Sequence, residues 1–146
     1  MKKTLYTLYI IIGCCIMASC DKLPKNGDLD GMWQLMTIEH NGTTNDVKDR
    51  QLYLSFQLDL FQLTKINSNT RYYGYFDNLG DRIVFRNFSD MAEEHPDNPD
   101  NYPITDLSII EPWGYYALSD TFHIESLTRN DMALRSKNAR ITYRKF

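Results

Sequence analysis

The chain has 146 residues, of which 42% are hydrophobic and 13% aromatic, and it carries 16 basic against 19 acidic side chains. This length suits a single domain, and the apolar fraction is too high for a disordered chain. Because the charges nearly balance, no broad basic field is available for nucleic acid, and we predict no nucleic-acid partner.

The first segment is predicted to be an export signal. Two lysines precede the mostly apolar run 5–16, whose length suits a signal-peptide core and is too short to span a bilayer comfortably. The run closes with Met17-Ala18-Ser19-Cys20, which resembles the bacterial lipobox. This resemblance implies a signal peptide over 1–19 and acylation at Cys20, which becomes the new N-terminus. The alternatives are a plain secreted protein and a retained N-terminal anchor.

Cleavage before Cys20 would remove Cys14 and Cys15 together with two lysines, taking the formal charge from −3 to −5. No internal disulfide could then form, so a single hydrophobic core must hold the domain. Residues 20–30 are polar and contain Pro and Gly, which is typical of a flexible tether. We therefore expect a lipidated cysteine and tether over 20–30 and one folded domain over 31–146.

Strand patterns follow one another from residue 31 onward, and no segment shows a sustained helical period. Turn-forming residues at 67–69, 77–80, 128–131 and 137–138 predict antiparallel neighbours. The predicted strands are 32–39, 51–66, 71–76, 82–88, 121–127, 132–136 and 139–145.

The clearest alternation lies in the segment 51–66. Its apolar members share one face of the predicted strand and should form one wall of the core. At Leu60 and Phe61 two apolar residues adjoin and the alternation changes phase, which predicts a bulge or corner. The apolar members are Leu52, Leu54, Phe56, Leu58 and Leu60.

The segment 87–103 is the one long irregular stretch, and loops of this length are usually functional or mobile. The segment 106–111 that follows is either a strand or a helical turn that ends before Pro112.

Seven or eight short antiparallel strands fit either a closed up-and-down barrel or a sandwich. Gly31-Met32-Trp33 resembles the Gly-x-Trp signature of the lipocalin and calycin superfamily. The resemblance implies an all-β, up-and-down antiparallel barrel of about eight strands, with Trp33 at one end under an arginine of the last strand. Arg140 and Arg144 stand in the corresponding region, and a guanidinium can stack on an indole.

The whole plan of lipobox, tether, Gly-x-Trp and alternating strands is similar to uncharacterised lipocalin-like outer-membrane lipoproteins of Bacteroidetes. The resemblance implies a lipid-anchored protein of the outer membrane. In that group, surface export is associated with acidic residues just after the cysteine. Because Asp21-Lys22-Leu23 holds a single acid, we expect a periplasm-facing protein rather than a surface-exposed one.

The sequence offers no catalytic motif and no metal motif, so we predict a non-enzymatic protein without a cofactor. A chain acylated at Cys20 has no free thiol, and no Gly-x-Ser-x-Gly elbow is present. A pair of catalytic carboxylates, as in glycosidases, is left as an alternative. The three histidines show no metal-ligand spacing. We expect His40 in a solvated turn, His123 facing outward, and His95 in a solvated acidic loop, with a cation site as its alternative.

Aromatic residues give the best indication of a ligand. Alternation places Tyr73 and Tyr75 on one face, with Tyr72 and Phe76 on the other after the flexible Gly74. These rings, with Trp113, Tyr115 and Tyr116, either fill the core or line a cavity or an exposed stacking platform.

A small apolar molecule in the barrel is the favoured ligand. A glycan bound by surface aromatics, or an envelope protein partner of unknown identity, is the alternative. The candidate ligand-binding residues are Leu54, Phe56, Leu58, Tyr73, Tyr75, Phe122 and Ile124.

Overall fold

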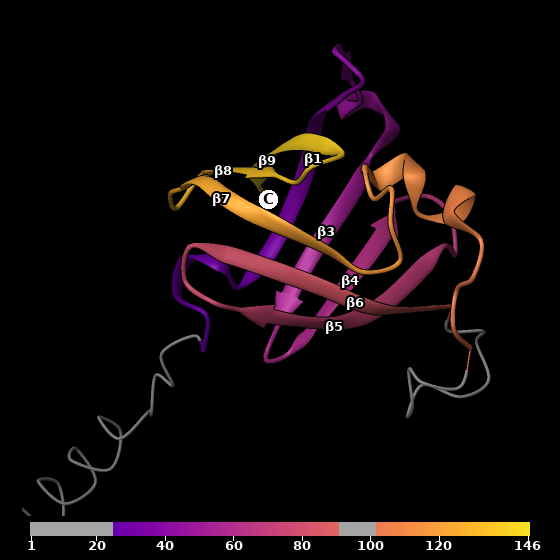
Figure 1. Cartoon of the computed structure of the whole chain (residues 1–146), viewed down its shortest axis with the longest axis horizontal. Coiled ribbons are helices and arrows are strands. Elements are labelled where there is room, and N and C mark those ends of the chain that lie inside the picture. The colour runs from indigo at the N-terminus through magenta and orange to yellow at the C-terminus, as the bar shows by residue number, and fades with distance from the viewer. Residues whose placement is uncertain (1–24, 91–101) are drawn as a thin grey trace, which may run out of the picture.

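The computed structural model describes residues 25–90 and 102–146, so the predicted signal peptide, Cys20 and His95 lie outside the described residues. The described residues form nine antiparallel strands in the order β2-β1-β3-β4-β5-β6-β7-β8-β9. Strand β1 also pairs with β9, which closes eight strands into a barrel and leaves β2 as an extra strand beside β1 (Figure 1). The predicted all-β closed barrel is confirmed, and the sandwich is excluded.

Predicted and observed strands agree closely for most of the chain, and the last predicted strand agrees residue for residue. The observed strands are β1 Gly31–His40, β2 Thr43–Asp46, β3 Leu52–Gln57, β4 Leu60–Lys65, β5 Arg71–Asn78, β6 Arg82–Asp90, β7 Asp120–Leu127, β8 Asp131–Arg135 and β9 Ala139–Lys145. The described 3₁₀ turns are η1 Gly27–Leu29, η2 Lys48–Arg50, η4 Leu107–Ile109 and η5 Glu111–Trp113. Of the two alternatives for 106–111, the helical turn is the one observed: η4 ends before Pro112, but the second turn, η5, contains this proline. Within these described ranges, no helix has the length and apolar character needed to cross a bilayer.

The predicted strand 51–66 is wrong, because the structure breaks it into the β3–β4 hairpin. Gln57 pairs with Leu60, so Leu58 and Asp59 form a two-residue turn. Leu58 has a φ of +57°, the left-handed conformation that such turns need, and 60% of its side chain is exposed. The phase change at Leu60 thus reflects a reversal of chain direction, and Leu58 does not lie on the interior wall.

Strand β2 escaped prediction because its four residues are polar and all exposed. It carries no alternation of apolar and polar residues, and only its pairing with β1 defines it as a strand.

The barrel interior is filled by inward-facing apolar side chains, many of them aromatic. The Phe61 ring makes edge contacts with Phe85 and Phe88, at centroid distances of 5.1 and 5.0 Å. Gly74 on β5 faces Phe61, and a Cβ atom at Gly74 would lie 2.4 Å from the Phe61 Cζ atom. Glycine at this position therefore gives the Phe61 ring its space.

The two ends of the barrel differ. The closed end consists of η1, the first residues of β1 and the β3–β4, β5–β6 and β7–β8 turns. The mouth consists of the β1–β2, β4–β5 and β8–β9 turns and the β6–β7 connection that carries η4 and η5. In Figure 1 the closed end faces the lower left and the mouth faces the upper right.

Trp33 is fully buried at the closed end, as the Gly-x-Trp resemblance implies. Its indole Nε1 donates a hydrogen bond of 2.8 Å to the carbonyl oxygen of Leu29 in η1. The Lys145 ammonium lies 4.1 Å from the centre of the Trp33 ring and donates to the carbonyls of Asp28 and Asp30. Burial lowers the pKa of Lys145.

The expectation that Arg140 or Arg144 covers Trp33 is wrong. Arg140 is hydrogen-bonded to Glu125 on β7, and Arg144 donates to the side-chain oxygen of Gln34. Lys145 takes this place because it is the register partner of Trp33, whereas residues 140 and 144 alternate to the outer face of β9.

Gly31 has a structural reason to be glycine. Its φ is +110°, and a Cβ atom there would lie 3.2 Å from the Lys145 Cε atom. Gly31, Trp33 and Lys145 therefore form one unit, in which the small residue lets the cation reach the indole.

Candidate ligand-binding site at the barrel mouth

The β6–β7 connection enters the mouth of the barrel. Residues 102–104 first run alongside β6, where the Ile104 amide donates to the Phe88 carbonyl at 2.8 Å. Residues 105–119, called the plug below, then fold over the mouth as η4 and η5. Among the described residues, the backbone hydrogen bonds of the plug lie within it, so side-chain contacts join it to the strands.

Gly114 directs the chain into the interior. It follows η5 with a φ of +87°, and a Cβ atom at this position would lie 2.8 Å from the Ile141 Cδ1 atom. The turn buries Trp113 on one side and Tyr115 on the other. A residue with a Cβ atom would suffer both an unfavourable φ and a clash.

Tyr115 occupies the centre of the barrel. Its ring centre lies 5.0 to 6.5 Å from four phenylalanine rings on the surrounding strands. The core alternative for Tyr115 is thus confirmed, and its ring lies among side chains of the described strands at this level of the barrel. The four rings are those of Phe61, Phe85, Phe88 and Phe122.

Three buried polar atoms close to the plug lack hydrogen-bond partners among the described residues: Trp113 Nε1, Tyr115 Oη and Tyr143 Oη. Burial raises the pKa of both tyrosines. The nearby Tyr143 and Asp120 raise the pKa of Tyr115 further. Asp120, the first residue of β7, is itself buried.

The sequence-predicted ligand residues do not share one site. Leu54, Phe56 and Phe122 are buried in the interior, and Ile124 is partly buried against the same core. Leu58 lies in the β3–β4 turn at the closed end.

Tyr73 and Tyr75 form a separate outer-face pair. Phe76 belongs to the core and Tyr72 packs against it, which confirms the predicted division of these aromatic residues between two faces. Tyr73 and Tyr75 are half-buried on the outer face, and the Arg86 guanidinium lies 5.7 Å from the centre of the Tyr75 ring.

His40 is not in a solvated turn. It ends β1, its ring stacks on Tyr116 at a centroid distance of 3.7 Å, and its Nδ1 lies 2.7 Å from the Asn138 carbonyl oxygen. This stack connects the plug to the rim of the mouth. His123 is exposed on β7, as predicted.

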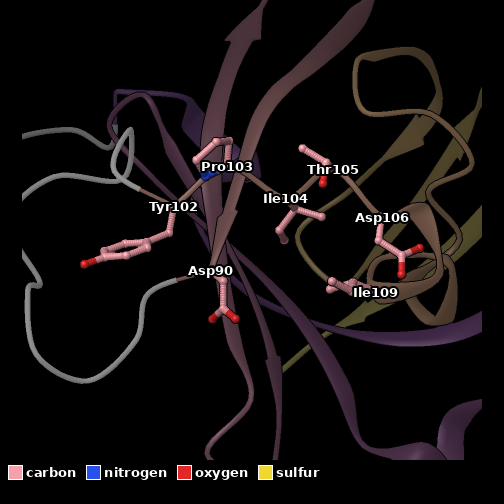
Figure 2. Close-up of a pocket in the computed structure, with 7 residues that line it drawn as sticks. All are labelled: Asp90, Tyr102, Pro103, Ile104, Thr105, Asp106 and Ile109. Carbon is pink, nitrogen blue, oxygen red and sulfur yellow. The ribbon is translucent and has the colours of Figure 1, made fainter.

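Two clefts flank η4 at the mouth. Figure 2 shows the first, of about 450 Å³, between the end of β6 and the start of the plug. Asp106 in this cleft caps η4, and hydrogen bonds from the Ser108 hydroxyl and amide lower its pKa. Because that carboxylate is engaged in a helix cap, it has a structural role. The lining residues are Asp90, Tyr102, Pro103, Ile104, Thr105, Asp106 and Ile109.

The second cleft, called the mouth cleft below, is larger, at about 680 Å³, and shares Ile109 with the first. It lies between the plug and strands β3 to β5. The Tyr72 ring meets Trp113 edge-on at 5.6 Å, and partial burial, with a smaller effect of Asp90, raises the pKa of Tyr72. The lining residues are Asp49, Arg50, Gln51, Leu52, Lys65, Ile66, Thr70, Tyr72, Ser108, Ile109, Pro112 and Trp113.

Sequence reasoning missed the mouth cleft because its residues come from four separate segments. The one local signal is Pro112-Trp113-Gly114-Tyr115, in which a glycine separates two large aromatics after a predicted turn. Within residues 25–90 and 102–146, no three His, Cys, Asp or Glu side chains are grouped so that they could hold a metal ion.

A closed antiparallel barrel of eight strands, with a tryptophan buried under a basic residue at one end, defines the lipocalin-like class of proteins. A family model described as a lipocalin-like domain matches residues 15–146, so the chain belongs to this family.

Three solved structures share the fold. A lipocalin-like protein from Bacteroides uniformis is 22% identical, with a TM-score of 0.60 over 82% of this chain and 100% of that chain. An uncharacterized protein from Bacteroides eggerthii is also 22% identical, with a TM-score of 0.59 over 81% and 99%. A protein from Burkholderia xenovorans is 14% identical, with a TM-score of 0.52 over 81% and 83%. No curated protein matches the chain.

Proposed function

We propose that this protein is a non-enzymatic, lipid-anchored binding protein of the outer membrane that holds a small apolar or amphipathic molecule at the barrel mouth. The mouth cleft is the observation that carries the proposal. Its volume of about 680 Å³ lies within the usual range for small-molecule sites. Barrels of this fold commonly bind small hydrophobic ligands.

The lining of the mouth cleft favours an amphipathic ligand. Leu52, Tyr72 and Trp113 supply an apolar and aromatic wall of the cleft. Arg50 and Lys65 are exposed among the lining residues, opposed by one carboxylate, Asp49. An apolar body with an acidic or polar end therefore fits this cleft best.

The packed interior moves the proposed site away from the lumen. Tyr115 fills the barrel centre, so a ligand cannot extend through it while the plug is in place. Of the residues predicted from sequence to bind a ligand, Leu54, Phe56, Phe122 and Ile124 support the core beneath the proposed site.

Titration with the fluorescent anion anilinonaphthalene sulfonate tests the site, because this probe combines an aromatic body with an acidic group. We expect saturable binding that Tyr72→Ala weakens about three- to tenfold, the effect of losing one aromatic contact. Tyr73→Ala is the matched control, because Tyr73 is the next residue along the chain and faces outward. No saturable binding, or equal loss in both variants, would contradict the proposal.

Intact-mass measurement of the protein extracted from its host's membranes tests the anchor. We expect a chain that begins at Cys20 and carries acyl mass, with Cys20→Ala as the control that stays unmodified. An unmodified chain beginning at Met1 would refute the anchor. Protease treatment of intact cells tests which side of the outer membrane the protein faces. Digestion of the protein would favour the cell surface over the periplasm.

Glycan or protein binding on the outer face is the second candidate. It rests on the half-buried Tyr73 and Tyr75, which lie near Leu60, a residue whose side chain is 38% exposed. Oligosaccharide binding that is lost in Tyr73→Ala and kept in Tyr72→Ala would favour this alternative.

A further inference from the structure

The closed end of the barrel exposes leucine side chains at two neighbouring turns. Leu58 in the β3–β4 turn is 60% exposed, and Leu79 in the β5–β6 turn is 56% exposed. Because successive strands run in opposite directions, both turns lie at the same end of the barrel (Figure 1). Isolated exposed leucines are ordinary on protein surfaces, but these two lie at the same end of one barrel.

Leu58 also has an unfavourable backbone conformation. Its φ of +57° is one that glycine and asparagine adopt most readily, and its mostly exposed side chain gains little from packing within the barrel. A large apolar residue kept at a strained, exposed turn points to a role outside the folded domain.

The β3–β4 turn is fastened to the first described residues of the chain. The Asn26 side chain donates to the Leu58 carbonyl at 2.9 Å, and Lys25 forms an ion pair with Asp59. The chain therefore enters the barrel beside the exposed leucine of this turn.

The number of residues between Cys20 and Lys25 limits how far this end can lie from an anchor. Four residues separate them, and each step along an extended chain spans at most about 3.6 Å. Cys20 therefore lies within about 18 Å of Lys25, whatever conformation these residues adopt. An anchor at Cys20 keeps the closed end at the membrane surface.

We propose that the closed end docks on the lipid bilayer, with Leu58 and Leu79 inserted at the interface and the mouth facing away from the membrane. The proposal rests on the anchor at Cys20 proposed above. Two leucines would bind a bilayer weakly by themselves, but tethering makes their insertion an intramolecular step at high effective concentration.

The basic residues beside the two leucines are paired with carboxylates. Lys25 pairs with Asp59, and Arg82 pairs with Asp81 at 3.3 Å, so neither basic residue is left without a carboxylate. Docking should therefore not require anionic lipid, unlike the attachment of a polybasic segment.

Quenching by brominated lipid tests the orientation. The chain 20–146 contains the whole barrel, and its only cysteine, Cys20, can be coupled to a maleimide lipid in phosphatidylcholine vesicles. Leu58→Trp places a fluorophore at the closed end. Leu118→Trp is the matched control, because Leu118 is a leucine, 37% exposed, in the plug at the mouth. Trp33 and Trp113 are buried and common to both variants.

We expect Leu58→Trp to lose emission in brominated vesicles relative to unbrominated ones, while Leu118→Trp keeps it. Leu79→Trp should behave like Leu58→Trp and replaces it if that variant fails to fold. Emission retained by both closed-end variants, or lost equally by Leu118→Trp, would overturn the proposal. Because chemical coupling replaces acylation, this result is independent of the mass measurement that tests the anchor itself.

Discussion

Trp33 combines three kinds of interaction at one residue, which makes it the clearest single determinant of the closed end. It is completely buried, its indole N–H is paired with Leu29, and Lys145 covers its ring. Each interaction comes from a different segment, so the side chain ties η1 and β9 to the first strand.

We predict that Trp33→Ala lowers the free energy of unfolding by about 3–5 kcal/mol, because it empties a large aromatic from a close-packed site. Trp33→Phe should cost less, since it keeps most of the ring and loses the hydrogen bond to Leu29. Urea unfolding measures both. A loss below about 0.5 kcal/mol for the alanine variant would be typical of a surface position and would contradict this assignment.

Gly114 combines a positive φ with a close approach of the Ile141 side chain. We predict that Gly114→Ala destabilises the protein by about 1–3 kcal/mol, because left-handed strain is added to a clash with Ile141. Gly42→Ala is the matched control, since its φ of +76° is similar and no atom lies within 4 Å of the added Cβ. If the two variants lose equal stability in urea, the clash has no role.

At the scale of elements, the plug distinguishes this barrel from an open container. It is joined to the strands by side-chain packing, with Ile110, Trp113 and Tyr115 as its buried members. Such an element depends on the fit of a few side chains, because no ladder of hydrogen bonds supports it.

Substitutions at Tyr115 separate the contribution of its hydroxyl from that of its ring. We predict that Tyr115→Phe leaves the free energy of unfolding unchanged or raises it by up to about 1 kcal/mol, because the buried hydroxyl meets only the Tyr143 hydroxyl and makes no hydrogen bond of regular geometry. Tyr115→Ala should cost about 3–5 kcal/mol through loss of the ring. Destabilisation above about 1 kcal/mol by Tyr115→Phe in urea would instead indicate that the Tyr143 hydroxyl or a bound water satisfies the Tyr115 hydroxyl.

At the scale of the whole molecule, the buried tyrosines predict loss of stability in alkali. Burial raises the pKa of Tyr115 and of Tyr143, whereas an unfolded tyrosine ionises near pH ~10. As the pH rises, the tyrosines of the unfolded state therefore lose their protons before those of the folded state. The folded protein keeps its full stability below about pH 10, and its free energy of unfolding declines as the pH rises further.

The double variant Tyr115→Phe/Tyr143→Phe should therefore lose less stability above about pH 10 than the natural protein. Urea unfolding between about pH 8 and pH 11 measures the two slopes. Parallel pH profiles would show that other groups cause the alkaline loss.

The strand pattern of the barrel was predictable from sequence because it is a local property. Alternation places residues on two faces through backbone geometry alone, so the interior positions of Leu54 and Phe122 followed from spacing. The same spacing separated Tyr73 and Tyr75 from Tyr72 and Phe76, but only the structure showed which pair faces outward. Gly31 and Trp33 were recognisable from the short Gly-x-Trp motif, although Leu29 and Lys145, which they contact, lie outside β1.

Only the tertiary structure decided which distant groups meet. Whether Arg144 or Lys145 covers Trp33 depends on the register at which β9 closes the barrel on β1. The filling of the interior by Tyr115 depends on how a connection of no regular pattern folds over the mouth. The break at Leu58 depends on cross-strand pairing that makes a strained turn acceptable. The sequence by itself determined a lipocalin-like wall of strands, because alternation is local, whereas closure and packing between remote segments set the contents of the barrel and the place of the candidate site.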